Sequence, residues 1–166
     1  MANRIQDEIR DYLQTALLTP ITGLKKFYSG KIEPSKIASS EMPVLMVYET
    51  SERLLSDQLT TARDKYRFGI TIEVIINAYA YVSEGGIETS KVLLGQRAVQ
   101  DIISARDSDG KPLATSILGV LRSNVLGSRY LFSNEIDIEF TNKNEDGKQF
   151  YIGTLTFSAV TSYNSR

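Results

Sequence analysis

The stretch Tyr66–Tyr81, YRFGITIEVIINAYAY, alternates apolar and polar side chains over most of its length. Successive side chains of a β-strand point to opposite faces, so this pattern predicts a long strand with one buried face and one mostly polar face. Its β-branched and aromatic residues favour a central place in an antiparallel sheet. The expected buried row is Tyr66, Phe68, Ile70, Ile72, Val74, Ile76 and Ala78, and the opposite face carries Arg67, Gly69, Thr71, Glu73 and Asn77.

The composition narrows the class of protein. A chain of 166 residues suits one domain, and 42% hydrophobic with 23% charged residues is ordinary for a soluble globular protein. The net charge of −1 provides no basic excess to attract nucleic acid. No apolar run approaches the roughly 18 residues that cross a bilayer, so we expect no membrane association. The opening residues, MANRIQDEIRD, mix both charges and do not indicate a signal peptide.

The chain contains neither histidine nor cysteine. Without cysteine there are no disulfides, thiolate metal sites or thiol nucleophiles. Without histidine the chain lacks the commonest general base, the commonest metal ligand and every Ser–His triad. Carboxylate-based catalysis is the one route that stays open. Because the chain lacks the residues that most enzymes use, we expect no enzyme, no catalytic residue, no cofactor and no metal site.

Further elements are expected on both sides of the central strand. An amphipathic helix with its apolar stripe packed on the sheet precedes two short strands, which are separated by an exposed loop rich in Ser, Lys and Pro. A second helix, a turn and a short helix follow, and then a β-hairpin with a polar tail. In chain order the expected ranges are helix 3–18, strand 24–28, loop 29–43, strand 44–48, helix 87–105, turn 108–110, helix 112–121, strand 130–140, hairpin return 146–147, strand 149–160 and tail 162–166.

These elements predict a single α+β domain. Its one antiparallel or mixed sheet has about four to five strands, flanked by the N-terminal helix and a second long helix. Residues 50–65, TSERLLSDQLTTARDK, are polar and lie between two strands. We interpret them as a projecting connection, either a hairpin arm or a short helix, and connections of this length are often functional.

A row of acidic residues is the one concentration of charge in the sequence. Glu135, Asp137 and Glu139 alternate with apolar residues on one expected strand, and Glu73 of the central strand is expected to join them across the sheet. The simplest interpretation is a solvated face, and the alternatives are a surface used in assembly or a metal-binding or catalytic pair. A straight row with about 7 Å between carboxylates fits metal binding poorly, because metal ligands converge from several directions.

Two stretches together with the order of elements resemble a known family. EMPVLMVYE at Glu41–Glu49 places a proline directly before a buried strand, and YRFGITIEVIINAYAY follows. From residue 3 to 160 the chain resembles the tail terminator (tail completion, minor tail) proteins of long-tailed bacteriophages. The resemblance implies a small α/β protein that assembles as a ring, usually a homo-hexamer. Such a ring caps the tail tube, ends its polymerisation and provides the surface that joins the head.

The resemblance also implies partners and surfaces. The partners are other copies of the chain, the tail tube protein and a head-completion or neck protein, at the tail–neck junction of a virion assembled in the host cytoplasm. DNA passes through the ring without sequence-specific binding. The acidic row (Glu73, Glu135, Asp137, Glu139) would line the lumen or a subunit interface. The connection would be an inter-ring arm with the charged residues Arg53, Asp57, Arg63, Asp64 and Lys65.

Two other functions stay open from the sequence. One is a different neck component, such as a head-completion or stopper protein. The other is a small carboxylate-using enzyme or ligand-binding domain, which would need a deep pocket joining Glu73 to the acidic strand.

Overall fold

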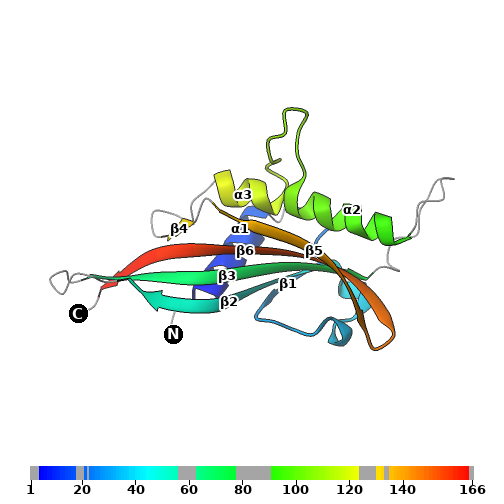
Figure 1. Cartoon of the computed structure of the whole chain (residues 1–166), viewed down its shortest axis with the longest axis horizontal. Coiled ribbons are helices and arrows are strands. Elements are labelled where there is room, and N and C mark those ends of the chain that lie inside the picture. Colours follow the sequence, from blue (N-terminus) through cyan, green and yellow to red (C-terminus); the bar gives the residue numbers. More distant parts are fainter. Residues whose placement is uncertain are drawn as a thin grey trace.

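The computed structural model of the chain describes residues 4–17, 21, 23–55, 63–77, 91–123, 130–132 and 135–164. These ranges contain three α-helices and six β-strands (Figure 1). The helices are α1 (Ile5–Leu17), α2 (Lys91–Ser104) and α3 (Ile117–Ser123). The strands are β1 (Lys26–Ser29), β2 (Val44–Leu54), β3 (Arg63–Asn77), β4 (Tyr130–Phe132), β5 (Asp137–Glu145) and β6 (Lys148–Asn164).

The strands form one mixed sheet, which confirms the α+β class. They lie in the order β1-β2-β3-β6-β4, and β5 pairs with β6 as well. β1 runs parallel to β2, and the other pairs are antiparallel. β3 is central as predicted, and it pairs with β6 from Arg63 opposite Asn164 to Asn77 opposite Phe150. Residues 78–81 of the expected strand lie outside the described residues.

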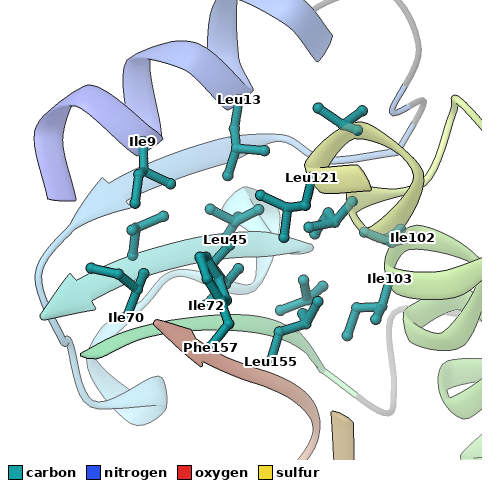
Figure 2. Packing of buried hydrophobic residues seen from close by; sticks show 14 of the residues in the cluster. Ile9, Leu13, Leu45, Ile70, Ile72, Ile102, Ile103, Leu121, Leu155 and Phe157 are labelled. Carbon is teal, nitrogen blue, oxygen red and sulfur yellow. The ribbon is translucent and has the colours of Figure 1, made fainter. Parts of the chain in front are cut away.

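The main hydrophobic core lies between the three helices and one face of the sheet, which we call the helix face (Figure 2). The predicted alternation of β3 is confirmed here, because Phe68, Ile70, Ile72, Val74 and Ile76 are all buried in this core. The apolar stripe of α1 packs on the protein's own sheet, as expected. The helices contribute Ile5, Ile9 and Leu13 from α1, Val99, Ile102 and Ile103 from α2, and Ile117, Val120 and Leu121 from α3.

The other side of the sheet, which we call the loop face, has a smaller core of its own. The segment 30–43 lies across one end of this face, below the sheet in Figure 1. Its predicted exposure is wrong in part, because two 3₁₀ turns direct Ile37 and Met42 inward onto Val44, Met46 and other strand residues. The polar residues of the segment therefore lie on its outer side only.

The strand predicted at 130–140 is wrong as a single element. Phe132 pairs with Ala159, whereas Asp137 pairs with Thr156, so the chain uses two more residues than β6 does between these pairs. The pairing therefore breaks into β4 and β5, and the sheet gains a strand beyond the four or five expected. The hairpin return is confirmed at Asp146 and Gly147, which both have positive φ, 51° and 72°.

Two other boundaries differ from prediction. The polar tail does not leave the sheet at residue 162, because β6 continues to Asn164 opposite the start of β3. The helix predicted from Pro112 begins only at Ile117, since Pro112 forms a β-bridge with Arg106 and Leu113 donates its backbone N–H to Ala105. The turn before it is confirmed, with Gly110 at a φ of 80°.

The connection at 50–65 is a hairpin arm where it is described. β2 continues to Leu54, which pairs with Tyr66, and the backbone N–H of Leu55 donates to the carbonyl of Lys65. Residues 56–62 lie outside the described residues. β3 and β6 extend past the helices on the left of Figure 1 and, with the end of β2, form the three-stranded arm.

Candidate interaction surface

Three of the four predicted acidic residues share the loop face. Glu73 and Glu139 both lie opposite Thr154 of β6, and Asp137 lies opposite the neighbouring Thr156. Two strand spacings separate Glu73 from Glu139, which is about 10 Å. Glu135 is exposed but precedes β5, so the row of three on one strand is wrong at its first member.

A tyrosine fixes one of these carboxylates. The hydroxyl of Tyr48 donates to Oε1 of Glu73 at 2.8 Å. Burial, followed by the hydrogen bond and the charge of Glu73, raises the pKa of Tyr48 well above its ordinary value, so the hydroxyl stays a donor. Nζ of Lys31 lies 5.5 Å from the centre of the Tyr48 ring, at the edge of the segment that covers this face.

The predicted arm residues separate onto different faces. Arg53 pairs with Arg67, and the alternation of β3 places both on the loop face. Lys65, two residues before Arg67 on the same strand, lies on that face as well. Asp64 belongs to the helix face by the same alternation. Asp57 lies outside the described residues, and Arg63 is placed by its backbone at the start of β3.

Arg67 is an exposed residue of the arm that was not among the predicted arm residues. The alternation of the central strand already grouped it with Glu73 on the polar face. The missing information was the position of Arg53, which depends on a register shift in β2 between Glu49 and Ser51. Sequence periodicity alone does not show such a shift.

Two acidic residues tie the covering segment to the sheet. Glu41 accepts hydrogen bonds from Lys26 and from Tyr28, the latter at 2.9 Å. Glu145 forms an ion pair with Lys143 at 2.9 Å and accepts from Ser35 at 2.8 Å. The hydrogen bonds from Lys26 and then Tyr28 lower the pKa of Glu41, and those from Lys143 and then Ser35 lower the pKa of Glu145.

We expect these ties to make stability depend on acid pH. A carboxyl group whose pKa is lowered by folding stabilises the protein above its unfolded pKa, and this contribution is lost as the pH falls through the folded pKa. The wild type should therefore lose more stability than Glu41→Gln/Glu145→Gln as the pH falls below the ordinary value of 4.5. Urea unfolding at a series of pH values from neutral to acid measures this. Parallel stability curves for the two proteins would contradict the assignment.

Two cavities lie at the turn between α2 and α3, away from the acidic residues. One has a volume of about 610 Å³ and is lined by Asp107, Lys111, Arg122 and neighbouring residues. The other has about 540 Å³ and is lined by Asp101, Arg106 and others. Neither is lined by Glu73, Asp137 or Glu139. These two cavities therefore do not form the pocket that a carboxylate-using enzyme would need at the acidic strand.

Within the part of the chain that the structure describes, no group of three or more acidic side chains is arranged to hold a metal ion. In the same ranges, no helix has the length and apolar character to span a bilayer. No protein-family model matches the chain, and no curated protein matches its sequence.

Proposed function

We propose that this protein is a structural component of a long-tailed bacteriophage or related particle. In this role it forms a homo-hexameric ring that caps the tail tube, ends its polymerisation and provides the head–tail joining surface. It acts through contacts with copies of itself, tail tube protein and a neck protein, not as an enzyme. DNA crosses the ring without sequence-specific binding, and the protein belongs to the tail–neck junction of a virion assembled in the host cytoplasm.

The observation that supports this proposal best is the three-stranded arm. β1 pairs with β2 only from Val44 to Val47, so among the described strands the outer edge of β2 has no neighbour from Tyr48 to Leu54. An edge strand with free backbone groups can accept another chain. The side chain of Leu54 on this edge is 52% exposed, whereas strand residues nearer the core are buried. Contacts with other chains would pair the free backbone groups of this edge and bury the side chain of Leu54.

The acidic residues support a role in assembly as well. Glu73, Asp137 and Glu139 lie on a strand face, whereas a catalytic carboxylate pair requires a substrate pocket. In a ring this face would line the lumen, where like charge opposes phosphate binding, or would meet a basic neighbour.

Polymerisation of the tail tube protein in the presence of this chain tests the proposal. We expect a substoichiometric amount to limit tube length in electron micrographs and to mark one end of each tube. Leu54→Asp should weaken capping because it replaces the exposed apolar side chain at the edge of the arm by a charged one. The matched control is Leu113→Asp, at the other exposed large hydrophobic residue of the described chain, which lies between α2 and α3. Tubes of unchanged length, with no protein at their ends, would contradict the proposal.

A further inference from the structure

The charges of the three-stranded arm separate onto its two faces. Arg53, Lys65 and Arg67 lie on the loop face, and all three are exposed. The acidic residues Glu52 and Asp64 lie on the helix face, since Glu52 pairs with a core residue of β3 and Asp64 alternates with Lys65. In the described part of the arm, the loop face therefore carries cations and no acidic residue.

The β-bulge in β2 produces this separation. Before the register shift the even-numbered residues of β2 lie on the loop face, and after it the odd-numbered residues do. Without the shift, Glu52 would pair with Arg67 and Arg53 would turn to the helix face. Gly69 leaves room for the bulge, because an added β-carbon would lie 2.5 Å from Oγ of Ser51. The bulge thus exchanges an acidic neighbour of Arg67 for a basic one.

The three cations lie close together and lack compensation from the chain itself. Arg53 and Arg67 are directly opposite each other on paired strands, where Cα atoms are about 5 Å apart. Lys65 lies about 7 Å farther along β3. Among the described residues, no ion pair involves any of the three. Like charges directly opposite each other destabilise a sheet, so the arrangement carries a cost that a bound anion would remove.

The density of positive charge favours phosphates over carboxylates as the partner. A protein would need three carboxylates as close together as these cations, and carboxylates at such distances repel one another. Double-stranded DNA already has this density, with one negative charge per about 1.7 Å of its axis. The exposed residues Ser51 and Ser162 lie on the same face of the arm, and serine hydroxyls donate to phosphate oxygens.

The loop face of the described arm has no aromatic residue. Proteins that bind single-stranded nucleic acids stack the bases on aromatic side chains. The aromatic residues of β3 within the arm, Tyr66 and Phe68, belong to the helix face and pack at the main core. The loop face of the arm is therefore suited to the sugar–phosphate backbone of a duplex. Contacts with phosphates carry no sequence information.

We propose that the loop face of the arm binds the phosphate backbone of double-stranded DNA through Arg53, Lys65 and Arg67. The acidic residues elsewhere on the loop face are too distant to prevent this contact. Asp137 lies four residues along and two strand spacings across from Arg67, which is roughly 16 Å, and Glu73 lies about 20 Å away. The Debye length of about 10 Å at 0.1 M salt is shorter than both distances.

The salt dependence of DNA binding tests the proposal. Fluorescence anisotropy of a labelled duplex of mixed sequence measures the affinity. Each neutralised phosphate contributes about −0.9 to the slope of log K against log salt, so three contacts per arm give about −2.7. Raising the salt from about 0.05 M to about 0.2 M should then weaken binding by the wild type about 40-fold. Arg53→Gln/Arg67→Gln should lose about two-thirds of the slope, and its binding should weaken only about three- to fourfold.

Two further variants separate charge on the arm from charge in general. Lys111→Gln/Arg122→Gln removes the same charge from exposed residues beside the turn between α2 and α3, and it should keep the wild-type slope. Arg53→Lys/Arg67→Lys keeps the charge and should keep most of the slope. A wild type that does not bind the duplex at about 0.05 M salt would overturn the proposal. So would an unchanged slope for Arg53→Gln/Arg67→Gln, or an equal loss in the Lys111→Gln/Arg122→Gln control.

Folding of the arm variant is checked on the same samples. Arg53→Gln/Arg67→Gln should be at least as stable in urea as the wild type, because it removes a pair of like charges from adjacent strands. A loss of DNA binding then reflects the loss of charge and not unfolding of the arm.

A labelled oligoglutamate in the same assay tests an acidic protein as the partner. We expect the duplex to bind more tightly than an oligoglutamate of equal total charge. Tighter binding of the oligoglutamate would overturn the proposal and assign the face to an acidic protein. Neither measurement needs tail tube protein, so each is independent of capping. A chain that caps tubes but does not bind the duplex would retain the proposed function and lose this inference.

Lysine acetylation locates the contact in the wild-type chain. Lys65 is exposed on the loop face of the arm, and Lys111 is exposed at the turn between α2 and α3. At low salt, saturating duplex should make Lys65 react several-fold more slowly with an acetylating reagent and leave Lys111 unchanged. Mass spectrometry of the digested protein measures both sites. Equal protection of the two lysines, or no protection of Lys65, would contradict the proposed contact.

Discussion

Replacing Ile72 by alanine should lower the free energy of unfolding by about 2–5 kcal/mol. Ile72 is fully buried on the central strand, opposite Val47 of β2 and Leu155 of β6, and both neighbours are fully buried. The helices cover this part of the sheet (Figure 2), so the surrounding side chains cannot easily fill the space that is lost. Urea unfolding at neutral pH measures the change.

A graded series strengthens that test. Ile72→Val removes one methylene group and should cost about 0.5–1.5 kcal/mol. The control Thr156→Ala, at an exposed position on the loop face, should change stability by less than about 0.5 kcal/mol. A loss for Ile72→Ala no greater than that of the control would contradict the central position of β3 in the core.

Gly119→Ala should destabilise the protein, although alanine ordinarily favours a helix over glycine by about 1 kcal/mol. A β-carbon at this position of α3 would lie 1.9 Å from the carbonyl oxygen of Leu113 and 2.7 Å from its carbonyl carbon. Those atoms belong to the backbone, so the turn before α3 would have to move. We expect the clash to outweigh the helix preference and to give a net loss of about 1–3 kcal/mol by urea unfolding.

Gly153→Ala provides the comparison. Its β-carbon would lie 2.2 Å from Cδ1 of Ile103 and 2.6 Å from Cγ1 of Val99, which are side-chain atoms, whereas the atoms that an alanine at position 119 would meet belong to the backbone. We therefore expect a smaller loss than for Gly119→Ala. A Gly119→Ala protein as stable as the wild type would show that α3 does not pack against the Leu113 backbone in this way.

The sequence predicts the elements whose side chains follow one simple period. The alternation of β3 and the apolar stripes of α1 and α2 are visible because one face of each element is buried. The loop segment 30–43 was harder to predict, since its 3₁₀ turns bury only single residues such as Ile37 and Met42 among polar ones. The break between β4 and β5 depends on their register against β6, which is a tertiary property.

The candidate surface was predictable to the same extent. Alternation placed Glu73, Asp137 and Glu139 on one face of the sheet, and the structure brings them together. It could not place Arg53 beside Arg67, because the bulge in β2 reverses the faces of the residues that follow it.

The native mass of the wild-type chain, measured across a concentration series with and without polymerised tail tube protein, tests the central claim most directly. We expect a closed assembly of about six chains, formed by the protein alone or on contact with tube ends. A protein that stays monomeric and does not bind tube ends at any concentration would contradict the proposed function.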